Sequence, residues 1–258
     1  MKDANFLATD GVRLHYVTGG AGVPLVLLTG YSGNTKDFAA SYDALSEQHT
    51  VICMDYRGHG ESDVPASGWH IERLAKDLYE LLSYLGVDSF YLLGHSMGNT
   101  VAWCFMELFG QERIRGYVLY EESPCLLANP AWTEAEQNRY LGKFRIPDVW
   151  SFPSLPPDGG EIDPRREAYL SNLVREHLTR DWRDAVESIR IPTLILMGEG
   201  SHFGAPELWD YLHDSIPGSR LEVIPAAQGG THMFHREDPE RFRKLVLDYF
   251  YEVQRDGK

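Results

Sequence analysis

The sequence contains few cysteines, few positive charges and no long apolar run. Only three of its 258 residues are cysteines (Cys53, Cys104 and Cys125), an odd number without the spacing of metal ligands. The formal net charge of −14 disfavours nucleic acid and anionic membranes as partners, because their phosphates would be repelled. No segment approaches the run of about 20 apolar residues that spans a bilayer, and residues 1–5 lack a signal-peptide pattern. We therefore expect a cytoplasmic protein that binds neither nucleic acid nor a membrane.

Short apolar runs alternate with helical patterns along most of the chain. An apolar fraction of 43% and a charged fraction of 24% are ordinary for a globular protein, and the length suits one α/β domain. The first segment, residues 6–17, reads as a hairpin with a tight turn at Asp10-Gly11. The expected buried strands that follow are residues 25–28, 51–54, 116–120, 193–197 and 220–224, with helices over 35–47, 74–85 and from Asp238 onward. Strands that alternate with helices predict a mostly parallel, doubly wound sheet behind an N-terminal antiparallel hairpin.

Residues 126–190 interrupt this alternation. They contain no convincing strand, several helical pieces and the irregular stretch 152–160. One helix is expected to begin at Asp163-Pro164, because aspartate caps helices well and proline is favoured in the first turn. The segment is rich in aromatic side chains, namely Trp132, Tyr140, Phe144, Trp150, Phe152, Tyr169 and Trp182. It is therefore read as a helical insertion in the expected sheet.

Residues 91–102 place the pattern Gly-x-Ser-x-Gly, centred on Ser96, between an apolar run and the start of a helical pattern. A serine hydroxyl is an effective nucleophile only when it is exposed, close to a base and followed by donors for the developing oxyanion. A sharp strand-to-helix turn supplies the exposure, and Gly94 and Gly98 let the backbone crowd there. The amide of Met97 would then face a negative charge from the start of the helix. This context predicts a nucleophile elbow with Ser96 as the nucleophile.

Four motifs, in the same order along the chain, resemble those of the α/β-hydrolase family. Besides residues 94–98 they are Leu28-Thr29-Gly30-Tyr31, Asp55-Tyr56-Arg57-Gly58-His59-Gly60-Glu61-Ser62 and Gly229-Gly230-Thr231-His232-Met233-Phe234. The resemblance runs from about Val12 to the last helix and implies an α/β-hydrolase fold. It also implies that residues 126–190 form a helical cap over the site, while residues 1–125 and 191–258 form the core domain. The aromatic residues of the insertion are then candidates for lining the pocket.

A nucleophilic serine needs a base, and the family keeps its base after the last strand, where His232 stands here. His235 is expected to lead into the final helix instead. A metal site at these two histidines lacks further ligands, so we expect no metal and no cofactor.

The acid is the point at which the chain departs from the common family pattern. Many members carry an aspartate a few residues past the seventh strand, but Ser201 stands there, and a serine cannot stabilise an imidazolium. Glu121 and Glu122 lie at the end of the sixth strand instead. This arrangement resembles the non-haem chloroperoxidase-like hydrolases and the zearalenone lactonases, which carry an acid there, and the matching position is Glu121. Glu199 and Glu122 remain alternatives.

The oxyanion needs two backbone donors, one after the nucleophile and one in the loop after the third strand. These are Met97 and, by resemblance, Tyr31, although Thr29-Gly30 stands where members often have His-Gly. Residues 57–62 are expected to be structural.

The whole pattern predicts a serine hydrolase whose partner is a small-molecule ester or lactone. Ser96 would form an acyl-enzyme, and water activated by His232 would release the acid. Hydrolysis of a C–C bond next to a ketone, and peracid formation with peroxide in place of water, are alternatives on the same residues. A non-catalytic ligand-binding protein on this fold is the alternative from another class. The joint presence of Ser96, Glu121 and His232 counts against it, because a binding protein needs no triad.

Overall fold

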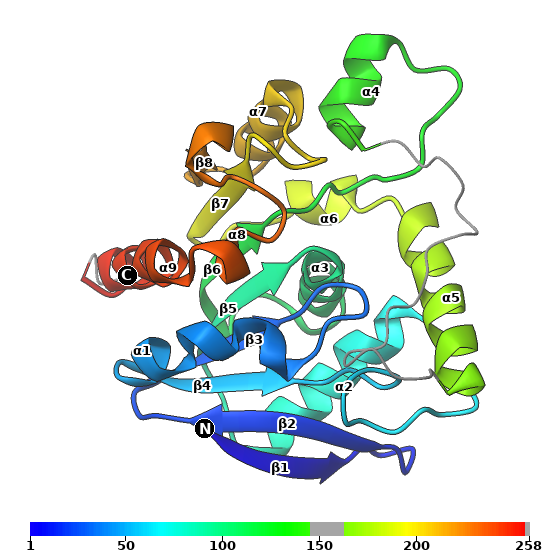
Figure 1. Ribbon diagram of the computed structural model, residues 1–258, viewed down its shortest axis with the longest axis vertical. Helices are drawn as coiled ribbons and strands as arrows, with labels where there is room; N and C mark the ends of the chain where they lie inside the picture. The colour runs from blue at the N-terminus through cyan, green and yellow to red at the C-terminus, as the bar shows by residue number, and fades with distance from the viewer. Residues whose placement is uncertain (145–162, 256–258) are drawn as a thin grey trace.

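An eight-stranded sheet forms the centre of the computed structural model, which describes residues 1–144 and 163–255 (Figure 1). The strands are β1 (Lys2–Leu7), β2 (Arg13–Gly19), β3 (Val23–Leu28), β4 (His49–Met54), β5 (Phe90–His95), β6 (Ile114–Tyr120), β7 (Thr193–Gly198) and β8 (Arg220–Ile224). Their spatial order is β1-β2-β4-β3-β5-β6-β7-β8. β2 pairs antiparallel with both β1 and β4, and the remaining neighbours pair parallel. The mostly parallel sheet with an antiparallel N-terminal hairpin is thereby confirmed.

The central strands are buried on both faces. In β3, Val26 and Leu28 belong to one apolar cluster and Leu25 and Leu27 to the other, because successive side chains of a strand point to opposite faces. The helices are η1 (Thr35–Ser41), α1 (Tyr42–Ser46), α2 (Ile71–Tyr84), α3 (Met97–Phe109), α4 (Glu134–Leu141), α5 (Pro164–Thr179), α6 (Arg183–Glu187), α7 (Pro206–Ser215), η2 (Ala226–Gln228), α8 (Phe234–Glu237) and α9 (Pro239–Arg255). The pair α2 and α3 covers one face, and α9 lies with η1 and α1 on the other (Figure 1). This double cover explains the continuous apolar runs of the sequence.

Two local expectations are wrong. The hairpin does not close with a two-residue turn at Asp10-Gly11, because the strand register pairs Leu7 with Arg13 and leaves residues 8–12 as the connection. The expected helix over 35–47 is divided into the 3-10 helix η1 and the short helix α1. The first residue of η1 is bonded to a side chain from another part of the chain. The carboxylate of Asp55, after β4, accepts a hydrogen bond from the amide of Thr35 at 2.6 Å.

The described chain between β6 and β7 is helical. It comprises α4, α5 and α6, and the described part of residues 126–190 contains no strand. Helix α5 begins as the sequence predicts, with Asp163 Oδ1 accepting from the amide of Arg165 at 2.8 Å and Pro164 as its first residue. Residues 145–162, with Trp150, Phe152 and the predicted irregular stretch, lie outside the described residues. Among the helices that are described, none combines the length and the apolar character needed to cross a membrane.

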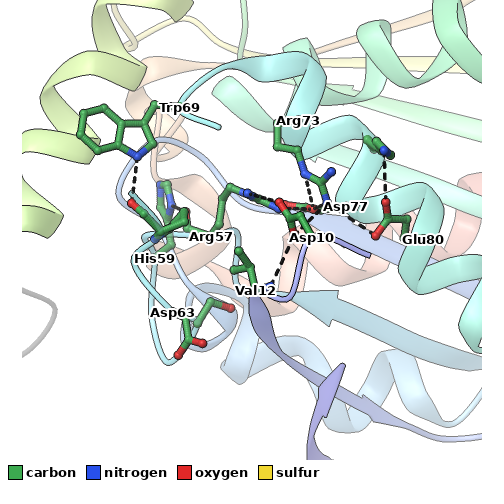
Figure 2. Close-up of polar contacts among 12 residues, drawn as sticks. Asp10, Val12, Arg57, His59, Asp63, Trp69, Arg73, Asp77 and Glu80 are labelled. Atoms are coloured by element: carbon green, nitrogen blue, oxygen red, sulfur yellow. Dashed lines mark hydrogen bonds and ion pairs between the residues drawn. The ribbon is translucent and has the colours of Figure 1, made fainter. Parts of the chain in front are cut away.

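A buried ionic cluster anchors the loop after β4 (Figure 2). Arg57 donates two hydrogen bonds to the carboxylate of Asp77 on α2, at 2.6 and 2.7 Å, and a third to Asp10 at 2.9 Å. Arg73, also on α2, donates to the same carboxylate of Asp77. Charge-assisted bonds of this kind compensate the loss of hydration that burial imposes on charged groups. Arg57 therefore joins the hairpin connection, the loop after β4 and α2, which is a structural role.

Candidate active site

Ser96 occupies a sharp turn between β5 and α3. Its backbone angles, φ 53° and ψ −132°, fall in a region that residues other than glycine rarely adopt. A Cβ added at Gly98 would come within 2.5 Å of the Leu28 carbonyl oxygen, and one at Gly94 within 2.7 Å of Asn99 Oδ1. Both positions therefore require glycine, because β3, β5 and α3 meet there without room for a side chain. The strand, turn and helix predicted around Ser96 are all present.

Backbone strain is concentrated at this place. Three described residues other than glycine have a positive φ, namely Ser32 at 57°, Ser96 at 53° and Glu121 at 57°. They lie just beyond the ends of β3, β5 and β6, which are neighbours in the sheet. Such conformations cost of order 1–3 kcal/mol each and persist only where the surrounding structure imposes them. The fold therefore imposes strained positions at the carboxyl ends of three adjacent strands.

The loop after β3 lies directly against Ser96. A Cβ added at Gly30 would come within 3.0 Å of Ser96 Cβ and 3.5 Å of Ser96 Oγ. Tyr31 follows Gly30, and Met97 follows Ser96 as the first residue of α3, so the two predicted oxyanion donors flank the same serine. Burial raises the pKa of the Tyr31 phenol to about 12, and its hydroxyl is therefore protonated at neutral pH.

His232 meets a carboxylate from β6. Its Nδ1 atom lies 3.1 Å from Oε2 of Glu121, which follows β6 and is fully buried. The other carboxylate oxygen of Glu121 accepts a hydrogen bond from the amide of Gly198 at the end of β7. With Nδ1 turned to Glu121, Nε2 is the ring atom left for Ser96. No hydrogen bond joins His232 to Ser96 Oγ in the described chain, and such bonds often tighten only in the substrate complex.

The alternative carboxylates have other partners. Glu199 is exposed, and its Oε2 accepts from the amide of Ala226 at 2.9 Å. Glu122 Oε1 accepts from the amide of Ser123 at 2.8 Å. Ser201, at the usual family position of the acid, accepts from the amide of Phe203 at 2.8 Å. Of the three candidate carboxylates, Glu121 is therefore the one that contacts His232.

Two side chains that were not predicted as site residues hold the backbone of His232. His95 Nε2 lies 2.9 Å from the carbonyl oxygen of His232, and the Tyr120 hydroxyl donates to the same oxygen at 3.2 Å. A carbonyl can only accept, so the proton of His95 is on Nε2. Burial lowers the pKa of His95 well below its usual range, so the ring stays neutral. The loop that carries His232 is therefore fastened to the ends of β5 and β6.

Ser96 and His232 both line a cavity of about 350 Å³. Of the aromatic residues expected to line it, Phe144 does so, whereas Tyr169 and Trp182 are buried in the apolar core. Trp132 and Tyr140 pack on each other with ring centroids 4.9 Å apart.

Other lining residues were not anticipated. They are His202 and Phe203 after β7, Met233 just before α8, Arg236 within α8, and Val174, His177 and Leu178 on α5. Burial lowers the pKa of His202 to about 3, and its ring centroid lies 4.4 Å from that of His232. The helical spacing of α5 indicates a buried face, but it does not show that this face meets the cavity.

The described residues of the cavity form no recognisable metal centre. The described residues contain no group of three or more His, Cys, Asp or Glu side chains that could hold a metal ion. His235 is buried beside Tyr120, whose hydroxyl accepts from its amide at 3.2 Å. Burial raises the pKa of Cys125 to about 11, so this cysteine is a thiol rather than a reactive thiolate.

Comparison with known proteins adds an independent observation. Residues 23–151 match the family model described as the alpha/beta hydrolase fold. The chain is 31% identical to a soluble epoxide hydrolase from Corynebacterium sp. (strain C12), over 93% of this chain and 94% of that protein. It superposes on an esterase from Exiguobacterium antarcticum with a TM-score of 0.77 at 24% identity, covering 98% of this chain and all of that one. A thermophilic esterase from Thermogutta terrifontis gives a TM-score of 0.74 at 25% identity, covering 98% and 99% of the two chains.

Proposed function

Because the chain belongs to the α/β-hydrolase family and is a hydrolase of that superfamily, we propose that it cleaves a carboxylic ester or lactone through an acyl-enzyme on Ser96. The observation that carries the proposal is a strained serine between β5 and α3 that shares one cavity with a carboxylate-bonded histidine. A cavity of about 350 Å³ suits a small-molecule substrate.

In this mechanism His232 Nε2 takes the proton of Ser96 as Oγ attacks the substrate carbonyl. Glu121 holds the Nδ1 proton and stabilises the imidazolium that forms. The backbone amides of Tyr31 and Met97 donate to the oxyanion of the tetrahedral intermediate. The imidazolium returns its proton to the leaving alkoxide, and the C–O bond of the ester breaks. Water deprotonated by His232 then attacks the acyl-enzyme, which releases the acid and restores Ser96.

We also propose that residues 126–190 act as a cap on a core formed by residues 1–125 and 191–258. The contribution of α5 to the cavity supports this division, because Val174, His177 and Leu178 reach the lining that also contains Ser96. Such a cover would exclude bulk water from the acyl transfer.

The similarity to an epoxide hydrolase raises a different reaction, which the nucleophile disfavours. Attack of the Ser96 hydroxyl on an epoxide carbon would give an ether, and water cannot release an ether by adding to a carbonyl. A carboxylate nucleophile would give an ester, but position 96 is a serine. C–C bond hydrolysis, peracid formation and non-catalytic binding remain outcomes that the experiment must separate.

The test is hydrolysis by the purified protein of aryl esters of graded acyl length, several lactones, an aryl epoxide and a vinylogous diketone, with and without peroxide. Turnover of esters or lactones by the parent, and loss of it in Ser96→Ala, is the expected result. Turnover of the epoxide or diketone alone, or ester turnover that survives in Ser96→Ala, would contradict the proposal.

A further inference from the structure

Glu122 follows Glu121 directly in the sequence. It is Glu121, however, that contacts His232, the base of the proposed triad. The side chain is completely buried and lines the same cavity as Ser96. Its Oε1 accepts from the amide of Ser123 at 2.8 Å. Its Oε2 has no hydrogen-bond partner among the described residues. A buried polar atom without a partner costs about 1–3 kcal/mol, and in a cavity wall a ligand atom can supply that partner.

His177 reaches the same place from a different element. It lies on α5 and is 7% exposed in its side chain, and its Nε2 stands 3.5 Å from Oε2 of Glu122. The two atoms are close without forming a hydrogen bond, and His177 Nδ1 also has no partner among the described residues. The pair therefore presents unsatisfied donor and acceptor atoms from the end of β6 and from α5.

Burial disfavours the charged form of both side chains. Burial raises the pKa of Glu122 well above its usual range and lowers the pKa of His177 to about 4. At 3.5 Å the two side chains could also form an ion pair. Their mutual attraction would then have to compensate the hydration that both charges lose on burial, and in buried pairs it often does not. The neighbouring lining is apolar, with Leu126, Val174 and Leu178. Burial accordingly favours a carboxylic acid at Glu122, which can donate as well as accept, beside an imidazole at His177.

We propose that Glu122 and His177 form a polar subsite of the cavity that binds an uncharged ketone or hydroxyl oxygen of the substrate. This inference rests on the proposed ester hydrolysis at Ser96 and specifies its substrate class. The protonated carboxyl donates to the ligand oxygen, and a ligand hydroxyl in turn donates to a free imidazole nitrogen. A carboxylate ligand would find no free counter-charge among the described lining residues, because Arg236, the cation among them, is paired with Asp37 at 2.6 Å.

The test compares each p-nitrophenyl alkanoate with isomers that carry one ketone or one hydroxyl at successive positions along the acyl chain. For the parent protein, at least one oxygenated isomer is expected to have a higher kcat/KM than the plain ester. His177→Leu and Glu122→Met should each reduce this preference about tenfold, the effect of one lost hydrogen bond to a buried group. Glu122→Gln, which retains a donor and an acceptor, should retain part of it. Glu167→Gln makes the same chemical change on the exposed side of α5, and its preference should equal that of the parent.

Inhibition supplies a second readout if a variant folds poorly or turns over slowly. A neutral secondary alcohol of matched chain length should inhibit hydrolysis of the plain ester by the parent more strongly than the alkane of the same length, because its hydroxyl can accept from Glu122 and donate to His177. This difference in inhibition should be smaller in His177→Leu. The substituted residue lies on α5, which carries no residue of the proposed triad. Failure of every ester and lactone would count against the proposed function itself. Hydrolysis without any preference for an oxygenated isomer, an unchanged preference in both truncating variants, or a preference for amine-bearing esters would each overturn the subsite alone.

Discussion

Oε2 of Glu121 lies 3.1 Å from Nδ1 of His232, although 111 positions separate the two residues in the sequence. The same carboxylate accepts from the amide of Gly198, so it joins the ends of β6 and β7 to the loop after β8. A Glu at the end of β6 therefore reaches the base across the end of β7. Its longer side chain suits that span, while Ser201 in the turn after β7 accepts from the amide of Phe203.

Replacement of Glu121 by glutamine should lower kcat, with little change in KM. The amide would face Nδ1 with a neutral group that can no longer stabilise the imidazolium, and the comparable change in a serine protease costs about 10⁴-fold. Steady-state kinetics on an aryl ester measures both constants. The control is Glu199→Gln, which alters a carboxylate bonded to the amide of Ala226 and should stay within about tenfold of the parent, or ~1.4 kcal/mol in the barrier. A large loss of kcat in Glu199→Gln, together with an active Glu121→Gln, would instead assign the role of the triad acid to Glu199 after β7.

Ser96 should react covalently with an aryl phosphonate, because the strained turn exposes its hydroxyl beside the proposed oxyanion donors. Mass spectrometry of a protease digest should find the added phosphonyl mass on the peptide that contains Ser96. Ser123, whose hydroxyl donates to the carbonyl oxygen of Cys125 at 3.0 Å, is a buried serine near the same strand ends. Its variant Ser123→Ala should still be labelled, and Ser96→Ala should not. Equal labelling of Ser96→Ala and the parent would remove Ser96 from the proposed role.

The local features of the site could be predicted from the sequence, because short-range patterns carry them. Residues 91–102 show the strand, the two glycines and the helix that make the turn at Ser96, and the structure contains each of them. Asp163-Pro164 similarly marks the start of α5. By contrast, nothing local distinguishes Glu121 from Glu122. Their difference arises at the end of β6, where the positive φ of Glu121 directs its side chain toward the loop after β8.

The contribution of α5 to the cavity could not be predicted in the same way. The sequence around His177 does not show where this side chain points, and its neighbour Glu122 is 55 positions away along the chain. Their proximity depends on how α5 packs against the core, which is a tertiary property. The prediction of a turn at Asp10-Gly11 was wrong for a related reason. The amide of Ala8 donates to the carbonyl oxygen of Val12 and the amide of Gly11 to that of Ala8, so the turn is set by the β1–β2 register rather than by Asp10-Gly11 alone.

Removal of Asp77 should destabilise the protein strongly. The side chain of Asp77 is fully buried and accepts from Arg57 and Arg73, so Asp77→Ala would leave two guanidinium groups with lost partners (Figure 2). Breaking a buried ion pair in this way costs about 3–5 kcal/mol in free energy of unfolding. Denaturant titration measures this difference. Asp248→Ala removes the exposed partner of Lys244 on α9 and should cost less than about 1 kcal/mol. Similar losses in both variants would show that the Arg57 cluster does not stabilise the fold beyond a surface pair.

The free energy of unfolding should fall in mild acid, and His59 should account for about one proton of that dependence. His59 is buried between Tyr56 and Tyr169, and its Nδ1 lies 3.0 Å from the carbonyl oxygen of Arg57. Burial lowers the pKa of His59 from its usual value of about 6.5 to about 4. The unfolded chain therefore binds a proton at His59 that the folded chain does not, between about pH 6.5 and pH 4, and stability is lost as pH falls through this window.

Replacement of His59 by glutamine removes the titrating group, so the slope of the free energy of unfolding against pH should decrease by up to about 1.4 kcal/mol per pH unit in that window. Urea titrations of the parent and of His59→Gln at a series of pH values measure the two slopes. The curves should run parallel above pH 7, where His59 is neutral in both states. Parallel curves through the acid window as well would mean that His59 takes up its proton in the folded protein.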